Sequence, residues 1–268
     1  MCRAISAALS ANSVLALDCV IESCVVELPS SSSHASGQVT CLHLGKAAND
    51  DADYHTACVI RDCYVDCGSN TKPFRGIEAS GGVGTIVENN RILNCRYGGP
   101  YQNGTDIPTK DLIVRGNYYY NVVYGIHLAV PSTIIPIGRI VLVENVLELE
   151  TSATPDPDPY GIKIDGNNTA GRFKVLVVRG NLIRHKDGGS GPSGSLGIRF
   201  NACTDAVVED NVVNVATANN AVLHDYCTIV KVFNNQKSSG EFLPVYDAQT
   251  GKHDWELTNE AEDAFLVR

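Results

Sequence analysis

A short motif recurs four times, in which Gly-Ile is followed by a polar or charged residue. It reads Gly76-Ile77-Glu78, Gly125-Ile126-His127, Gly161-Ile162-Lys163 and Gly197-Ile198-Arg199. Side chains alternate between the two faces of a strand, so the residue after an inward-pointing Ile points outward. We therefore expect His127, Lys163 and Arg199 on consecutive strands of one outer surface. Degenerate copies at Cys41-Leu42-His43 and Ala221-Val222-Leu223 extend this column at both ends.

A second outward column lies two residues further along the same strands and is rich in acids and amides. Its members are Ser80, Ala129, Asp165, Asn201 and Asp225. Cations stacked ~5 Å apart repel one another unless anions such as Asp165, Asp225 or an acidic ligand offset them. The candidate catalytic residues are His127, Lys163, Arg199 and Asp165, and the candidate substrate-binding residues are Tyr160, Asn201 and Asp225.

These residue types suit chemistry on an acidic polysaccharide. In a lyase reaction, a cation such as Lys163 or Arg199 neutralises the uronate carboxylate and acidifies the neighbouring proton. His127 or Tyr160 would then act as the base that removes this proton, or as the acid that protonates the leaving oxygen.

Two other interpretations of the same columns stay open. A hydrolase would need paired carboxylates such as Asp165 and Asp225, which two rungs would separate by roughly 10 Å, a distance that suits inversion better than retention. A solvated outer strand would show the same residue types without any chemistry, and so would a surface that only contacts glycans.

A second repeat marks the elements that must hold these columns. Segments such as Ile113–Asn117 and Val177–Asn181 alternate apolar residues with a period of two before a turn. The turn residues form one column: Cys19, Cys63, Asn90, Asn117, Asn145, Asn181, Asn211 and Asn235. Asn tolerates a left-handed backbone and its amide can bond the Asn above and below, so we expect an Asn ladder. The charged residue near each turn alternates in sign: Arg61, Glu88, Arg115, Glu144, Arg179 and Glu209.

Stacking is the physical reason for such a repeat. A lone short strand cannot bury its apolar face, whereas parallel copies stacked ~4.8 Å apart share one core. The sequence therefore predicts an all-β fold, a single-stranded right-handed parallel β-helix of about seven to eight rungs over residues 1–237.

The two ends of the chain leave the repeat. Residues 238–268 are expected to form a short C-terminal cap that carries the single Trp, Trp255, and a short helix that begins at the capping box Asn259-x-x-Glu262. At the other end, only Arg3–Leu9 is available as a short helical plug.

The ten Cys residues follow the repeat. We expect Cys19 to stack on Cys63, and Cys24, Cys67 and Cys95 to form a second stack. Buried Cys behaves as a small hydrophobe, so a ladder of thiols is the first expectation and disulfides between neighbouring rungs are the alternative.

Composition narrows the range of partners. The formal net charge is −9 and no basic stripe is visible, so we expect no nucleic-acid binding. No run approaches about 18 apolar residues, which predicts no membrane span, and Met1–Leu9 is too short and too broken for a clear signal peptide. The Asp-rich stretch Asn49–Asp53 has ligands that suit Ca²⁺, but a solvated loop is the stronger expectation, so no metal or cofactor is predicted.

The Asn column and the interleaved Gly-Ile motifs resemble the repeats of the pectate-lyase-like parallel β-helix superfamily, over roughly residues 12–236. That superfamily includes polysaccharide lyases, glycoside hydrolases, alginate epimerases and phage tailspikes. The resemblance implies an extracellular, cell-surface or virion protein with a polysaccharide partner. The chain lacks Gly-His-Gly, Asn-x-Asp followed by an Asp pair, and Asp-Pro-His-Glu, which argues against a standard polygalacturonase or alginate epimerase.

Two hypotheses on function follow. The first is a carbohydrate-binding or carbohydrate-active protein, either a polysaccharide lyase or a glycoside hydrolase, with the loops at 150–160 and 186–195 as the walls of a cleft. The second is a non-catalytic structural or adhesion module, such as a segment of a tailspike or surface protein. In that case the same face would be flat or packed in a homotrimer, or the chain would be part of a longer one.

Overall fold

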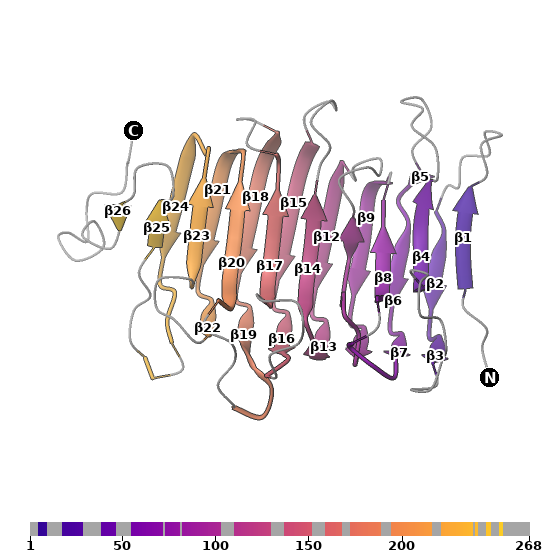
Figure 1. Ribbon diagram of the computed structural model, residues 1–268. Helices are drawn as coiled ribbons and strands as arrows, with labels where there is room; N and C mark the ends of the chain where they lie inside the picture. The colour runs from indigo at the N-terminus through magenta and orange to yellow at the C-terminus, as the bar shows by residue number, and fades with distance from the viewer. Residues whose placement is uncertain are drawn as a thin grey trace.

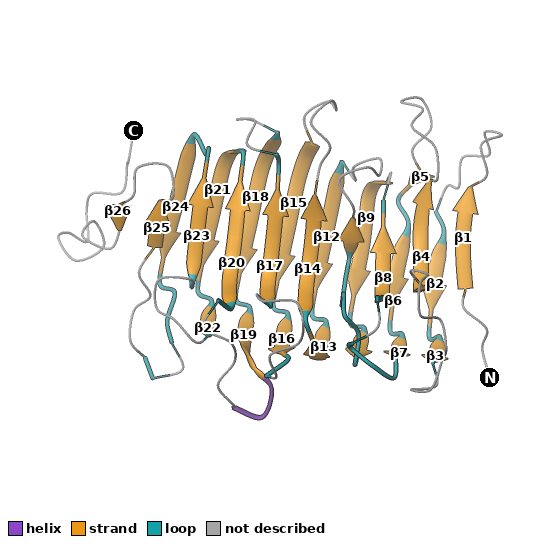
Figure 2. Ribbon diagram, in the orientation of Figure 1, coloured by secondary structure: helices purple, strands orange, loops and turns teal. Residues whose placement is uncertain are grey.

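The computed structural model is an elongated solenoid whose chain winds through three sheets of parallel strands (Figures 1 and 2). The structure describes residues 5–9, 18–28, 39–46, 55–71, 73–80, 82–102, 110–129, 137–151, 159–167, 172–188, 194–215, 221–237, 239–240, 245–247 and 252–253. Each turn passes from sheet B through sheet C to sheet A, whose strands run upward at the front of Figure 1. The turns advance from the N-terminus at the right to the C-terminus at the left, and they are right-handed. The predicted all-β right-handed parallel β-helix is therefore confirmed.

Seven complete turns, from β2–β3–β4 to β21–β22–β23, precede the partial turn that contains β24 and β25. Sheet A contains β1 (Ile5–Leu9), β4 (Val39–Lys46), β8 (Phe74–Ala79), β11 (Tyr101–Gln102), β14 (Tyr124–Ala129), β17 (Tyr160–Asp165), β20 (Leu196–Asn201), β23 (Val222–Asp225), β25 (Val245–Asp247) and β26 (Lys252–His253). Sheet B contains β2 (Val20–Glu22), β5 (His55–Thr56), β6 (Val59–Arg61), β9 (Gly82–Glu88), β12 (Asp111–Arg115), β15 (Ile137–Val143), β18 (Phe173–Arg179), β21 (Cys203–Glu209) and β24 (Ile229–Phe233). Sheet C contains β3 (Val25–Glu27), β7 (Tyr64–Asp66), β10 (Arg91–Leu93), β13 (Tyr118–Val122), β16 (Val146–Leu149), β19 (Leu182–His185) and β22 (Val212–Asn214), and a short 3₁₀ helix, η1 (Lys186–Gly188), follows β19.

The core fills the inside of the coil with stacked apolar side chains. Strand alternation sends every second residue inward, as in β12, where Leu112 and Val114 are buried and Ile113 faces out. The Ile of each Gly-Ile motif is completely buried, as the motif predicts: Ile77, Ile126, Ile162 and Ile198. Because neighbouring rungs are in register, these residues form columns that bury apolar area continuously along the solenoid.

The Asn ladder is present from Asn90 to Asn235. Each backbone N–H and one side-chain N–H of an Asn donate to the Oδ1 of the Asn on the next rung, at 2.8–3.1 Å. The other amide proton donates to a strand carbonyl of the preceding rung, at 2.9–3.0 Å. The left-handed residue of each turn is the one before the Asn, for example Gly116 or Glu144, so the Asn is selected for its amide and not for a positive φ.

The first rung corrects the predicted column. Cys63, whose N–H donates to Asn90 Oδ1, is aligned with Cys24, because Val25 pairs with Tyr64. Cys19 instead aligns with Cys58 at the start of sheet B, because the next residues, Val20 and Val59, pair. Sequence alone offered two Cys residues five positions apart, and only strand pairing distinguishes them.

The glycines of the Gly-Ile motifs, here called the marker glycines, are required because the next rung lies too close for a side chain. A Cβ on Gly125 would lie 2.3 Å from the carbonyl oxygen of Gly161, and a Cβ on Gly161 would lie 2.8 Å from the carbonyl oxygen of Gly197. Both glycines sit where sheet A begins and the chain turns tightly around the core. Backbone of the neighbouring turn cannot give way as a flexible side chain can, so these positions exclude any larger residue.

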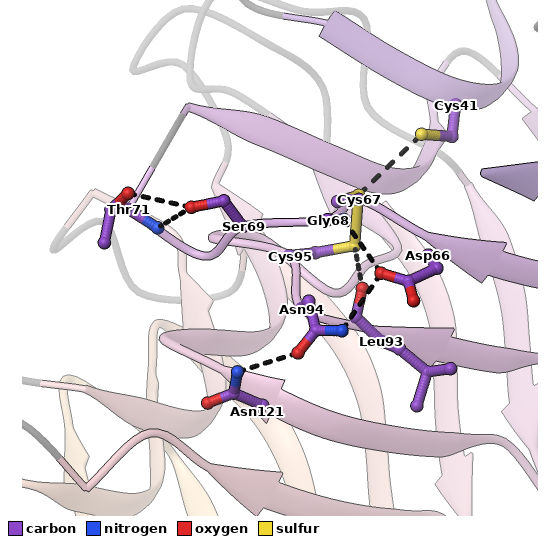
Figure 3. The surroundings of a disulfide bond; sticks show 10 residues. All are labelled: Cys41, Asp66, Cys67, Gly68, Ser69, Thr71, Leu93, Asn94, Cys95 and Asn121. Carbon is purple, nitrogen blue, oxygen red and sulfur yellow. Dashed lines mark hydrogen bonds between the residues drawn. A yellow bond between two sulfur atoms is a disulfide. The ribbon is translucent and has the colours of Figure 1, made fainter. Parts of the chain in front are cut away.

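One disulfide, between Cys67 and Cys95, joins neighbouring rungs after sheet C (Figure 3). This corrects the expectation of a ladder of thiols alone at these two positions, while Cys24 lies in the other column. Cys41, on sheet A, places its Sγ 3.7 Å from Cys67 Sγ. Burial, with a smaller contribution from Asp66, raises the pKa of the Cys41 thiol to about 12, so it stays protonated at neutral pH.

Reduction of the Cys67–Cys95 bond is expected to lower the free energy of unfolding by about 3.5 kcal/mol, because the bond closes a loop of 28 residues in the unfolded chain. Urea unfolding with and without dithiothreitol measures the difference. The matched control is the Cys67→Ala/Cys95→Ala variant, whose stability should not respond to the reductant. An equal response in both proteins would assign the effect to other cysteines.

The ends differ from expectation in one respect. Arg3–Leu9 was a candidate helical plug, but Ile5–Leu9 forms strand β1, which pairs in parallel with β4. At the other end, β25 lies within the predicted cap, pairs in parallel with β23 and thereby extends sheet A. Trp255 and the predicted capping box at Asn259 lie outside the described residues, so the cap and its boundary at residue 238 stay predictions.

Candidate functional site

The outer face of sheet A carries the predicted column in the predicted register. His127 pairs with Lys163, and Lys163 pairs with Arg199. One member was missed: Tyr101, on the two-residue strand β11, lies between Glu78 and His127. No Gly-Ile motif precedes Tyr101, so the sequence repeat could not place it.

A strip of aromatic rings runs along this face. It consists of Tyr97, Tyr101, Tyr124, Tyr160 and His127, and we call it the aromatic strip. Neighbouring ring centroids lie 4.5 Å apart for Tyr97–Tyr101, 5.1 Å for Tyr97–Tyr124 and 4.4 Å for Tyr124–Tyr160. The His127 ring meets Tyr101 at 5.3 Å and Tyr160 at 5.5 Å, both edge-on. Tyr101 and Tyr124 are buried, whereas Tyr97, Tyr160 and His127 are partly exposed. Packed rings of this kind are rigid and have little side-chain entropy left to lose on binding.

The three consecutive tyrosines Tyr118–Tyr120 lie elsewhere. Tyr119 points into the core and is completely buried, while Tyr118 and Tyr120 stack on the outer face of sheet C with centroids 6.5 Å apart. Only Tyr124 of the Tyr118–Tyr124 group reaches the sheet A face. The aromatic strip is assembled from three consecutive rungs.

A closed ion pair borders the strip toward the N-terminus. Arg75 Nη1 lies 2.7 Å from Glu78 Oε2, and its guanidinium carbon lies 4.1 Å above the Tyr101 ring. The hydroxyl of Thr40 donates to the same carboxylate at 2.8 Å, and His43 Nε2 lies 3.8 Å from it. Arg75 and Glu78 are both buried, so this end is already neutralised by its own partners.

An open charge cluster borders the strip toward the C-terminus. Lys163 Nζ lies 3.7 Å from Asp165 Oδ2. Asp165 also accepts hydrogen bonds from the Asn167 N–H at 2.9 Å and the Asn201 amide at 3.2 Å. Burial alone would raise the pKa of Asp165, but these hydrogen bonds, with Lys163 and Arg199, outweigh it and hold the pKa below its ordinary value. Asp165 is therefore ionised at neutral pH.

The amide and acid nearest the C-terminal end complete the second column. Asn201 pairs with Asp225 on the next rung, and its side chain accepts a hydrogen bond from the Gly166 N–H. Asp165 and Asp225 lie two rungs apart, as predicted, with Asn201 between them. An ionised, firmly held Asp165 does not fit the general acid of an inverting hydrolase.

The protonation states of His127 and Tyr160 separate the roles that the sequence left open. Burial, reinforced by Lys163, lowers the pKa of His127 to about 4, so its imidazole is neutral at pH 7. Its Nδ1 is buried and has no hydrogen-bond partner among the described residues. Burial, with Tyr124 and other strip tyrosines, raises the pKa of Tyr160, which keeps its proton. His127 can therefore accept a proton and Tyr160 can donate one.

Insertions lie on both edges of this face. The predicted walls between sheets C and A, at 150–160 and 186–195, lie beside the starts of β17 and β20, and parts of both are outside the described residues. The corner between sheets A and B also carries insertions, after β11, β14 and β17. Loops therefore lie at two corners of the solenoid, and not only at the corner that carries the predicted walls.

Comparisons with protein families, with curated proteins and with solved structures found no match. The fold assignment therefore rests on the architecture of the structure alone. No matching protein supports the resemblance to the pectate-lyase-like superfamily or indicates an activity. Within the part of the chain that the structure describes, no cluster of three His, Cys, Asp or Glu side chains could hold a metal ion, and Asn49–Asp53 lies outside that part. No described helix is long and apolar enough to cross a bilayer.

The depressed pKa of His127 predicts a loss of stability in mild acid. Between pH 6.5 and about 4 the unfolded chain protonates this imidazole and the folded chain does not. The free energy of unfolding therefore decreases by up to about 3 kcal/mol as the pH is lowered through this range. Burial also lowers the pKa of His185, which acts in the same direction. The measurement is urea unfolding at pH 7 and pH 4 for wild type and His127→Gln. Parallel losses in both proteins would show that the pKa of His127 is not depressed.

Proposed function

We propose that this protein binds an acidic polysaccharide along the outer face of sheet A. Sugar rings would lie on the aromatic strip, and a uronate carboxylate would lie at Lys163 and Arg199. The observation that carries this proposal is the continuity of the strip with an open cationic border at one end only. The other border, Arg75 with Glu78, is already paired and buried.

The strip supplies the apolar part of such a site. Tyr rings offer flat area of fixed orientation for the apolar faces of sugars. Lys163 Nζ lies 5.3 Å from the Tyr160 ring centroid, so one bound sugar can meet both a ring and a cation. Lys163 and Arg199 are half-buried, and Asp165 offsets only part of their combined charge. A carboxylate would be the natural further partner.

A lyase reaction at the same place is the second candidate, favoured by neutral His127, which pairs with Lys163 and meets the Tyr160 ring edge-on. The cations would neutralise the uronate carboxylate and acidify the proton on the adjacent carbon. His127 would take that proton, a carbon–carbon double bond would form, and the bond from the next carbon to the glycosidic oxygen would break. Tyr160 would protonate the departing oxygen. Bound carboxylate beside His127 would raise its pKa toward a value that suits a base.

The test is binding of wild type to uronate polymers, such as polygalacturonate and alginate, and to a neutral glucan, followed by calorimetry. We expect binding to the acidic polymers only, and a loss of about tenfold in affinity for Lys163→Ala. The matched control is Lys174→Ala, an exposed lysine on sheet B, which should bind as wild type does. Absence of binding by wild type, or equal binding by Lys163→Ala, would overturn the proposal.

The same samples decide the chemistry. A lyase releases an unsaturated sugar end, which ultraviolet absorbance detects, whereas a hydrolase releases only new reducing ends. Binding without either product would leave a polysaccharide-binding module and remove the lyase candidate. A role as a purely structural module predicts no binding at all.

A further inference from the structure

The outer face of sheet B carries an uninterrupted column of aliphatic side chains. The members, one on each rung in register, are Val20, Val59, Ile86, Ile113, Val141, Val177 and Val207, and Lys231 ends the column. Val20 is 52% exposed, and Ile229, at the edge of the same face, is 39% exposed. The central outward column of sheet A is instead mainly polar and aromatic. An aliphatic outer face of this length is a feature of interaction surfaces.

A column of alternating charge flanks the aliphatic column on its C-terminal side. In register it reads Glu22, Arg61, Glu88, Arg115, Val143, Arg179, Glu209 and Phe233. Val143 occupies the place predicted for Glu144, which lies in the turn with a φ of 56°. Ion pairs join Arg115 to Glu88 at 2.6 Å and Arg179 to Glu209 at 3.5 Å, yet the arginine side chains are 53% and 58% exposed. Their outer donors are therefore free to meet further acids.

The face is large enough for a stable interface. Eight strands at ~4.8 Å spacing give a length of ~34 Å, and strands of about six residues give a width of ~20 Å. The flat area is then ~700 Å² per copy and ~1,400 Å² for two copies, within the usual range for specific complexes.

We infer that sheet B is the interface between two antiparallel copies of this chain. The two-fold axis would run parallel to the strands, midway between β12 and β15, so that the eight stacked strands from β2 to β24 overlap, β5 lying off this stack. This axis places Arg61 opposite Glu209, and Glu88 opposite Arg179, each twice. It also sets Ile113 against Val141 and Ile86 against Val177 in the aliphatic column.

A further outward column of sheet B, which contains Asp111 and Arg139, fits the same axis. Asp111 and Arg139 are register partners on β12 and β15, so the axis sets Asp111 of one copy against Arg139 of the other. Val83 would meet Val175. No position in the charge column or in these central pairs faces a like charge. A parallel arrangement about an axis along the aliphatic column would instead set Glu209 of one copy against Asp205 of the other, which like-charge repulsion opposes.

Sedimentation velocity of the full chain over a range of concentrations tests the inference. Wild type should form a dimer. Arg61→Glu should weaken the dimer at least about tenfold in Kd, because it faces Glu209 at two symmetric places. Adding Glu209→Arg should restore the dimer. This double change breaks the pairs of Arg61 with Glu22 and of Glu209 with Arg179 inside each copy, so rescue can only come from contact between copies.

The control is Arg91→Glu on the outer face of sheet C, which should leave association unchanged. Circular dichroism of every variant checks that the solenoid is folded, and exposed ion pairs contribute little to stability. A monomeric wild type, a trimer, or a double variant without rescue would each overturn the inference. Polysaccharide binding uses the opposite face of the solenoid, so its success or failure is independent of this test.

Discussion

The Asn145→Ala variant is expected to lose about 4 kcal/mol of unfolding free energy. Asn145 is completely buried at the middle of the ladder. Its Oδ1 accepts hydrogen bonds from the backbone and the amide of Asn117 at 3.1 and 3.0 Å. Its Nδ2 donates to Val114 O and Asn181 Oδ1, both at 3.0 Å. Alanine would leave donors and acceptors on both neighbouring rungs unpaired in a site that water does not reach, and each costs ~1–3 kcal/mol.

The measurement is equilibrium unfolding in urea, with secondary structure followed by circular dichroism. Asn214→Ala is the matched control, because Asn214 is an exposed residue of β22 and the same substitution there should change stability by less than about 0.5 kcal/mol. Equal, small effects of the two substitutions would show that the ladder contributes little. Solenoids can unfold in segments, so a broadened transition for Asn145→Ala would place the first break at this rung.

The Tyr160→Ala variant is expected to bind acidic polysaccharide about 30- to 150-fold more weakly than wild type. Tyr160 is the ring that connects the two halves of the proposed site, since it packs on Tyr124 at 4.4 Å and on His127 at 5.5 Å. It also lies beneath the cation of Lys163. Loss of such an anchor typically costs ~2–3 kcal/mol of binding free energy, which gives the stated range.

Calorimetry against the polymer that wild type binds best measures this change. Tyr118→Ala, the same substitution on the outer face of sheet C, should leave affinity unaltered. Tyr160→Phe separates the two proposed roles, because it keeps the ring and removes the acidic proton. We expect near-normal binding by Tyr160→Phe and, if the protein is a lyase, a large fall in turnover. Normal binding by Tyr160→Ala would place the ligand elsewhere.

The parallel β-helix followed from the sequence because its signals are local. Apolar alternation decides which side chains enter the core, and each turn repeats the same chemistry around Asn117 or Asn181. The marker glycines were equally visible, since Gly125 and Gly161 meet the backbone of the next turn and tolerate no side chain. The column of His127, Lys163 and Arg199 followed from these markers because rungs with the same turns stack in register.

Other features depended on the tertiary structure, because no local sequence signal marks them. The first rung has cysteines in place of Asn, so only strand pairing shows that Cys24 and not Cys19 continues the ladder. Tyr97 and Tyr101 carry no marker, and they enter the aromatic strip because the turn before β11 sets them against neighbouring rungs.

The arrangement of residues on the outer surfaces and the protonation states in the site likewise depended on tertiary structure. Neutral His127 and ionised Asp165 are consequences of burial and of partners on other rungs, which the order of residues does not reveal. Local sequence thus determined the solenoid and which residues face outward. Rung stacking, which depends on loops of variable length, decided which outward residues become neighbours, and therefore where a ligand or a second copy could bind.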